Sequence, residues 1–524
     1  MAPALLGPAA PALADEHFTH LAVDGDTLVG LAAKYLAQPE RWQPLQRLNR
    51  IADPTRIRPG TPIRIPLSMM RTEPSPAKVR SVHGPVESGV AALKADSFVA
   101  EGTSLKTGAD GFATLELADG STIVVQSNSR ARLARSQRIP GVAGSQLTGV
   151  ALESGRLEAG VARQRGAANR FEVTTPTSNM GVRGTRFRVA AERGGSRGEV
   201  LEGVVGVASP DSRNELALQA GFGTVVDATG QAAAPVRLLS APDLAAAVDL
   251  QERIVLRFRF SALAGATQYR GQIAADPQFQ RLLKDAMFKS PEAKFGDLPD
   301  GNYFLRVRGV DARGIEGEDR VLPFRLKARP EPPFLSAPAD RHKSSAGPVQ
   351  LTWSSALEAA SYRIQVASDS RFTRLLLDEA GIAATQRSVE LGPGDYFWRV
   401  ASTRADGDRG PYGDAQSFVL KALPKPPDPP KEEGGRVRFS WGAEPGQVFD
   451  FQLARDAAFA DLVASQRLDQ PTITVDKPTS AGMYYMRYRA IDPDGFIGPY
   501  SGAQTLEVKS QPWWLLVLLL LLVK

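Results

Sequence analysis

Residues 301–314 read GNYFLRVRGVDARG, and two later stretches repeat this pattern. They are GDYFWRVASTRADG from residue 394 and GMYYMRYRAIDPDG from residue 482, so the three copies begin 93 and 88 residues apart. In each copy a Gly precedes a Tyr by two positions, and side chains then alternate with the two-residue period of a half-buried strand. The chain therefore contains an internal repeat of β-strand type.

An earlier part of each copy repeats as well. The three stretches are YRGQIAADPQFQ (269–280), YRIQVASDSRFT (362–373) and FDFQLARDAAFA (449–460). An aromatic residue comes before each of them: Trp353 in the second copy, Trp441 in the third, and Phe258 or Phe260 in the first. Several short strands around one inner aromatic residue predict a small β-sandwich.

The three copies resemble fibronectin type III domains in tandem. We place them at residues 241–328, 331–422 and 433–509, with Pro-rich linkers at 328–333 and 423–433. Such linkers are semi-rigid, so the array would act as a spacer. We expect Tyr303, Tyr396 and Tyr484 to pack inside the sandwiches rather than to contact a ligand.

Residues 81–228 form a second β-rich block, in which short alternating runs are separated by Gly. The clearest hairpin signal is Asp119-Gly120 within GFATLELADGSTIVVQ (111–126). Further on come TP, VRGTRF (182–187), an EG-x-V-x-V run and GFGT (221–224). This order resembles the FecR-type domain, which implies an all-β, solenoid-like fold and a periplasmic protein partner.

Two arginines of this block are candidates for partner contact, Arg183 and Arg186. The alternative for Arg183 is an internal arginine paired with a carboxylate or with free carbonyl groups, because its apolar neighbours are predicted to be buried. Signal-relaying FecR proteins also carry a cytoplasmic anti-sigma segment and one membrane span. We find neither here, so only partner binding is carried over.

The N-terminal block contains VDGDTLVGLAAKYL (23–36). Leu28, Leu31, Ala32 and Tyr35 recur on one helical face, and Asp26 or Thr27 can cap the first turn. A second short helix ends at Asn49, and an alternating strand closes at residue 66. The predicted order over residues 17–66 is β-α-α-β, followed by a linker at 67–80.

The positions that agree in this block resemble a LysM module, a family that binds N-acetylglucosamine-containing glycans such as peptidoglycan and chitin. The resemblance implies a shallow groove between two loops. Its candidate residues are Gly25, Asp26, Thr27, Leu28, Asn49, Ile51, Ala52 and Asp53. Leu28 and Ile51 would contact the acetyl methyl group, while Asp26 and Thr27 could also serve only as helix caps.

Both ends of the chain are apolar. Residues 1–16 resemble a secretory signal without a basic start, or else form a disordered leader. Residues 512–524 contain 11 consecutive apolar residues, Trp513 to Val523, which is too short to cross a bilayer but could contact a membrane.

Composition narrows the function. The 524 residues include no Cys and carry a net charge of only +6, which excludes thiol chemistry and does not suggest a nucleic-acid partner. We find no catalytic motif and predict no metal site and no cofactor.

The sequence therefore predicts a mainly β, multidomain, non-enzymatic protein of the bacterial envelope or periplasm. It would bind peptidoglycan through its first block and an unidentified envelope protein through its second. The alternatives are a periplasmic sensor in cell-surface signalling and an accessory subunit of a cell-wall hydrolase.

Overall fold

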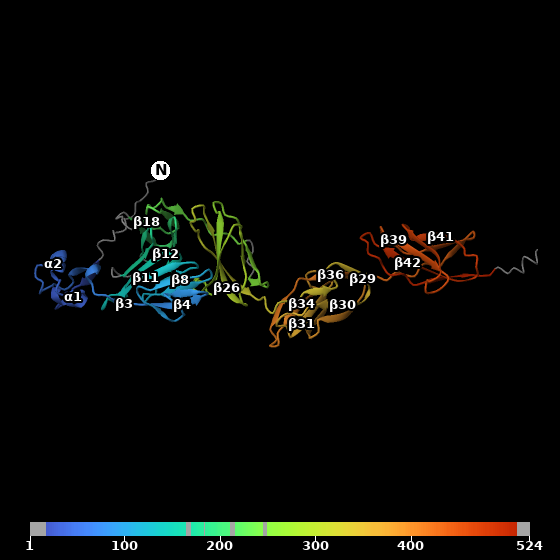
Figure 1. The fold of residues 1–524 in the computed structure, drawn as a ribbon, viewed down its shortest axis with the longest axis horizontal. Helices are drawn as coiled ribbons and strands as arrows, with labels where there is room; N and C mark the ends of the chain where they lie inside the picture. Colours follow the sequence, from blue (N-terminus) through green and yellow to red (C-terminus); the bar gives the residue numbers. More distant parts are fainter. Residues whose placement is uncertain (1–16, 164–168, 183, 210–214, 245–248, 511–524) are drawn as a thin grey trace, which may run out of the picture. The chain divides into compact units, whose positions relative to one another are not determined.

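The computed structural model describes residues 17–163, 169–182, 184–209, 215–244 and 249–510 (Figure 1). The leader at 1–16, Arg183 and the tail at 512–524 lie outside the described residues. The chain divides into two units, 1–327 and 328–524. Strands dominate both units. Within the described residues, no helix has the length and apolar character needed to cross a membrane.

The first module has the predicted β-α-α-β order. It consists of β1 (His17–Leu21), α1 (Leu28–Tyr35), α2 (Gln43–Asn49) and β2 (Pro62–Pro66), and β1 pairs antiparallel with β2. The four apolar residues of α1 that recur on one face are all buried, which is why this short amphipathic segment is helical.

The core of this module continues into the next domain. Leu67 and Met70, which follow β2 around the short 3-10 helix η1 (Leu67–Met69), are buried in one apolar cluster with Ile139 and Leu147. The segment 67–80, predicted as a linker, thus contains core residues and the first strands of the middle domain. The module packs directly on that domain.

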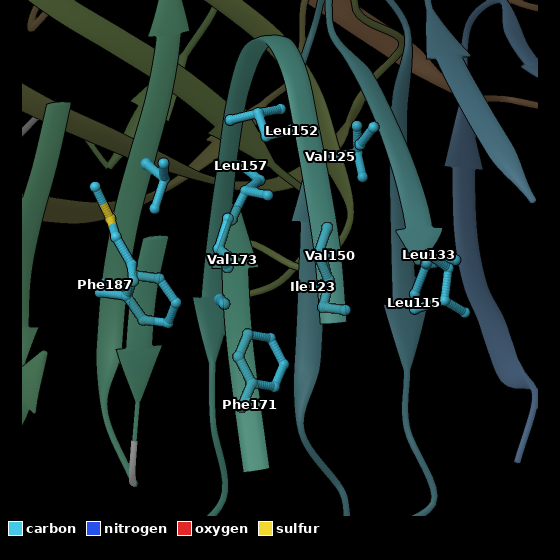
Figure 2. Packing of buried hydrophobic residues seen from close by; sticks show 14 of the residues in the cluster. Leu115, Ile123, Val125, Leu133, Val150, Leu152, Leu157, Phe171, Val173 and Phe187 are labelled. Atoms are coloured by element: carbon cyan, nitrogen blue, oxygen red, sulfur yellow. The ribbon is translucent and has the colours of Figure 1, made fainter. Parts of the chain in front are cut away.

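The middle domain is a closed path of hydrogen-bonded strands around one apolar core. Figure 2 shows ten of its core side chains, among them Leu152, Leu157, Phe171 and Phe187, which point into the space between the strands. The strands are β3 (Glu73–Pro74), β4 (Ala77–His83), β5 (Val86–Ser88), β6 (Ala91–Ala92), β7 (Phe98–Val99), β8 (Ser104–Thr107), β9 (Phe112–Glu116), β10 (Thr122–Val125), β11 (Arg130–Arg138), β12 (Gln146–Gly160), β13 (Asn169–Thr174), β14 (Asn179–Val182), β15 (Arg186–Glu192), β16 (Gly195–Glu202), β17 (Val204–Ala208), β18 (Leu216–Gln219), β19 (Phe222–Asp227) and β20 (Val236–Arg237).

The long strand β12 links the two sides of this domain. Its first part pairs with β11 and its last part with β15 and β10, and the change falls at Gly155. Gly155 has φ +90°, and a Cβ atom there would lie 2.5 Å from Cα of Ser129. Only glycine fits this close approach of two backbones.

A β-sandwich follows within the first unit. One sheet has the order β21-β27-β26-β23-β24 and the other pairs β22 with β25. The strands are β21 (Leu250–Gln251), β22 (Leu256–Arg259), β23 (Gln268–Ala274), β24 (Leu282–Phe288), β25 (Glu292–Phe295), β26 (Gly301–Val310) and β27 (Arg320–Leu326).

One face of this sandwich is buried against the middle domain, and we call this contact the joint. Phe279 and Leu282 pack there with Phe112 and Val124 of the middle domain. Arg306 donates two hydrogen bonds to the Glu158 carboxylate, Nη1 to Oε1 at 3.1 Å and Nη2 to Oε2 at 2.8 Å. The alternating polar residues of β23 and β26 are therefore buried instead of facing solvent.

Charges at the joint are paired across it. Arg188 of β15 lies 3.0 Å from the Asp319 carboxylate and donates to the carbonyl oxygen of Gly317, also at 3.0 Å. Burial by itself would raise the pKa of Glu158, but the facing arginines, Arg306 foremost, lower it to about 2. Glu158 is thus ionised and held by arginines.

Glu199 of β16 behaves differently. Its carboxylate accepts a hydrogen bond from the backbone N–H of Glu316 at 3.2 Å, and its side chain is buried. Burial, together with the nearby Glu316 carboxylate, raises the pKa of Glu199 to about 7. A carboxyl group with a raised pKa in the folded state destabilises the fold as pH rises from its unfolded value towards its folded value.

The second unit contains two more sandwiches, each of two sheets. The second sandwich is built from β28 (Leu335–Ala337), β29 (His342–Ser345), β30 (Gly347–Trp353), β31 (Ser361–Ala367), β32 (Leu375–Ile382), β33 (Gln386–Leu391), β34 (Gly394–Thr403), β35 (Arg409–Tyr412) and β36 (Gln416–Lys421). The third is built from β37 (Lys431–Glu433), β38 (Arg436–Ser440), β39 (Val448–Ala454), β40 (Leu462–Leu468), β41 (Thr472–Asp476), β42 (Gly482–Ile491) and β43 (Gln504–Val508).

The three repeated tyrosines are buried, and each ties a turn to its strand. The hydroxyl groups of Tyr303, Tyr396 and Tyr484 donate to the backbone carbonyl oxygen four residues earlier, at 2.8, 2.9 and 3.0 Å. Among the core aromatics, Phe260 packs on Tyr269 as Trp353 packs on Tyr362. Phe260, and not Phe258, thus takes the tryptophan position in the first copy.

A tight loop is also repeated in all three sandwiches. Phe279, Phe372 and Phe459 have φ values of 57°, 57° and 60°, which bulky residues rarely adopt. In each loop an Asp three residues earlier accepts backbone N–H groups and holds this conformation, as Asp369 does from Arg371, Thr373 and Arg374.

The loop places its Phe ring beneath an arginine of the neighbouring strand. Arg306 lies 4.4 Å from the Phe279 ring, and Arg399 lies 3.9 Å from the Phe372 ring. In the second sandwich Tyr412 covers the other side of Arg399 at 4.2 Å. In the third, Arg487 lies in the same way between Phe459 and Tyr500, at 3.9 and 4.0 Å.

The two Pro-rich segments that we predicted as linkers each contact the sandwich that follows them. Ser402 donates to the carbonyl oxygen of Glu331, and Tyr488 donates to that of Lys425, at 2.7 and 3.0 Å. These segments therefore contribute to the packing of the second and third sandwiches.

We predict that Glu199→Gln stabilises the joint at pH 8 and leaves it nearly unchanged at pH 5. Glutamine still accepts the hydrogen bond but cannot ionise, so the gain at pH 8 should be on the order of 1–3 kcal/mol. Hydrogen exchange of β15 and β16 in the whole protein, compared with wild type at each pH, measures it. Glu153→Gln, an exposed position on β12, is the control. An equal effect at both pH values would contradict the assignment.

We also predict that Tyr396→Phe destabilises the second sandwich by about 1 kcal/mol, because it removes one hydrogen bond and leaves the ring in place. Hydrogen exchange of β31 and β34 in the whole protein, followed with rising denaturant, reports on this domain. Tyr485→Phe, at a partly exposed position of the third sandwich, should change nothing in that signal.

Candidate glycan-binding site

The loop before α1 is held by its own side chains. Gly25 has φ +87°, the left-handed conformation that glycine supplies at no cost. The carboxylate of Asp26 accepts the backbone N–H of Val23 at 2.8 Å, and the Thr27 hydroxyl accepts that of Gly30 at 2.9 Å. Thr27 thus caps α1, whereas Asp26 bonds to Val23 ahead of the helix and shapes the loop.

His20 of β1 stabilises this loop through hydrogen bonds. Its Nε2 lies 2.8 Å from Oδ2 of Asp26, and its Nδ1 lies 3.3 Å from the Tyr35 hydroxyl. The hydrogen bond with His20 lowers the pKa of Asp26. Sequence reasoning missed His20 as a support, because no local pattern relates a residue of β1 to the loop six residues later.

Asn49 ties the end of α2 to β2. Its side-chain amide donates to the carbonyl oxygens of Leu45 and Arg64 at 2.9 and 2.8 Å, and its oxygen accepts the N–H of Arg64 at 2.7 Å. This amide is used by the backbone around it. Asn49 therefore positions the following loop, and the next residue, Arg50, turns the chain with φ 53°.

The loop that follows carries three candidates with different roles. Ile51 is half-buried, and its carbonyl oxygen accepts the side-chain amide of Gln46 at 3.0 Å. Ala52 is exposed. Asp53 accepts both the N–H and the hydroxyl of Thr55, at 2.9 and 2.7 Å, which closes a tight turn.

The two loops lie side by side. The backbone N–H of Leu28 donates to the carbonyl oxygen of Pro54 at 2.8 Å, so the start of α1 is joined to the loop after α2. The candidate residues predicted from sequence are thus brought together by the fold. The Leu28 side chain is fully buried in the core beneath, which leaves Ile51 as the candidate apolar contact at the surface.

Arg186, the second candidate for partner contact, is engaged at the joint. Its guanidinium donates to the Glu158 carboxylate at 3.1 Å and lies 3.4 Å from that of Asp319. These bonds hold Arg186 towards the first sandwich, so its role in the described structure is to pair carboxylates.

Two family models match parts of the chain. Residues 22–66 match the LysM domain, and residues 103–206 match the FecR protein family. A search of curated proteins gives no match.

Solved structures give distant similarities. Two structures of a protein described as an anti-sigma factor from Parabacteroides distasonis share 21% identity over 26% of this chain, with a TM-score of 0.21. The chain spans 59% of the length of that protein. The FN1–FN3 domains of chicken CNTN1 share 15% identity and cover 52% of this chain and 99% of that one, with a TM-score of 0.20.

The described geometry and the two family matches agree on the order of the first blocks. The β-α-α-β module at 17–66 contains the first match, and the closed β-domain packed on it contains the second. The chain contains a LysM domain followed by a FecR domain.

Proposed function

We propose that this chain is a non-enzymatic protein of the bacterial cell envelope that binds peptidoglycan through its LysM domain. LysM domains bind glycans of the peptidoglycan type. The observation that carries the proposal is the hydrogen bond between Leu28 and Pro54, which fixes two loops side by side at the start of a helix. The N–H groups of Leu28 and Gly30 are already bonded within the module, so an acetamido group would bond to other backbone groups of these two loops.

The residues of the site divide into two roles in this proposal. Asp26, Thr27, Asn49 and Asp53 hold the loops, because their side chains bond to backbone groups of the module. Gly25, Ile51 and Ala52 supply the contact surface, and Ile51 meets the methyl group of the sugar. A single site of this size binds weakly, so attachment through several chains on one cell wall would strengthen it.

The FecR domain and the docked first sandwich would present the protein-binding part. FecR domains suggest a protein partner and cell-surface signalling. A periplasmic sensor is therefore our second candidate function, and the same FecR match favours it. Crosslinking in cells names the partner and separates the two: a signalling protein favours the sensor, and a structural envelope protein favours the anchor.

We predict that Ile51→Asp weakens binding to peptidoglycan while the module stays folded. A carboxylate at this half-buried surface position would face the acetyl methyl group, at a cost of about 1–3 kcal/mol or roughly 5- to 150-fold in affinity. Co-sedimentation of the whole protein with purified sacculi measures it, and titration with N-acetylglucosamine oligomers tests the ligand directly.

Val90→Asp is the matched control, because Val90 is a fully exposed apolar residue of the middle domain. Leu28→Asp is unsuitable as a test, since a charge in the core of the module would unfold it. Hydrogen exchange of α1 and α2 in the whole protein checks the fold of the module in each variant. Equal sedimentation of Ile51→Asp and wild type would count against the proposed surface.

A further inference from the structure

A small cavity lies in the joint between the FecR domain and the first sandwich. It is just large enough for one guest of about the size of a water molecule. Strands β12, β15 and β16 contribute Arg156, Arg188 and Arg197 to its lining, and the sandwich contributes Arg270. Four guanidinium groups therefore surround a space of one-atom size.

Three of these arginines have an N–H group with no hydrogen-bond partner among the described residues. These are the Nε atoms of Arg156, Arg188 and Arg197, each of which is buried. The Arg188 side chain is only 4% exposed. A buried donor without an acceptor costs about 1–3 kcal/mol, so three at one cavity favour a guest that accepts.

The rest of each guanidinium is held in place. Arg188 Nη1 donates to the Gly317 carbonyl oxygen at 3.0 Å, and both Arg156 and Arg197 donate to the Glu192 carboxylate at 3.1 Å. The groups are thus fixed before any guest arrives, and binding would cost little ordering of side chains.

The charge at the cavity also favours a negative guest. The ion-pair cluster of described residues around the cavity joins seven arginines to six acidic residues, namely Arg156, Arg186, Arg188, Arg197, Arg270, Arg306 and Arg308 with Glu158, Glu192, Glu199, Asp285, Glu316 and Asp319. Burial and the proximity of Glu316 raise the pKa of Glu199 to about 7, so part of its charge is lost near neutral pH. The cluster as a whole then carries a small excess of positive charge.

Size and hydrogen bonding narrow the class of guest. A carboxylate or phosphate group needs several times the volume, so polyatomic anions do not fit. Water would fit, but it must also place two protons, whereas a halide only accepts. We propose that this cavity binds one monatomic anion, chloride under physiological conditions, which completes the joint. This inference does not depend on glycan binding.

The test uses the whole protein and chloride itself. Line broadening of ³⁵Cl in nuclear magnetic resonance reports the bound ion, and added bromide should reverse it. Arg156→Gln removes the unpaired Nε–H together with the ion pairs to Glu192 and Glu316. We expect the affinity for chloride to fall at least tenfold, the factor that one charge-assisted hydrogen bond supplies. Arg156→Lys keeps the charge but not this Nε–H, and should also weaken binding.

Arg130→Gln is the matched control, because Arg130 is an exposed arginine of β11 whose Nε lies 3.9 Å from the Glu153 carboxylate. It should leave the broadening unchanged. Crystals soaked in bromide supply an independent readout, and the proposal expects an anomalous peak beside the Nε atoms of Arg156 and Arg188. A water molecule there without anomalous signal, or equal broadening in Arg156→Gln and Arg130→Gln, overturns it.

Discussion

The ion pair between Arg306 and Glu158 joins two successive domains through residues that lie 148 positions apart. Both side chains are almost fully buried, and the two hydrogen bonds between them cross the joint. Removing two charges from water is costly, so the pair contributes little net stability. Losing either member would leave an unpaired buried charge, which is far more costly. The pair therefore acts mainly to permit one docking geometry and to exclude others.

The same principle extends through the first unit. The LysM core packs on Ile139 and Leu147 of the FecR domain. Phe112 and Val124 of the FecR domain in turn pack on the first sandwich. The LysM domain thus packs on the FecR domain through apolar contacts, and the FecR domain packs on the first sandwich through apolar contacts and paired charges. A glycan held by the first loops would thus act on the FecR domain without a flexible linker between them.

Local patterns predicted much of this fold. The helical period of residues 28–35, the Asp119-Gly120 turn and the repeat with its tyrosines depend on neighbours in sequence, and the structure has each of them. The joint could not be predicted in this way. Arg306 and Arg308 alternate with apolar residues in β26, which is the pattern of a strand with one face in solvent. That face is buried only because a distant domain covers it.

The candidate glycan-binding site also combines features that have local sequence signals with features that depend on tertiary contacts. Sequence placed its loops correctly at the start of α1 and after α2, because caps and turns have local signals. It could not separate the residues that shape the loops from those that face outwards. His20 and Asn49 act through partners in other elements of the module, and the burial of Leu28 depends on the whole core.

Tyr412 and Tyr500, whose rings contact Arg399 and Arg487, show how the three sandwiches differ from one another. In the first sandwich the position of Tyr412 and Tyr500 is taken by Asp319, the carboxylate that pairs with Arg188 of the FecR domain. If the three copies arose by duplication, their equivalent faces have since diverged. A FecR domain meeting the second or third copy would leave Arg188 without the carboxylate of Asp319. Shuffling of the repeats would therefore be tolerated downstream of the first copy and penalised at it.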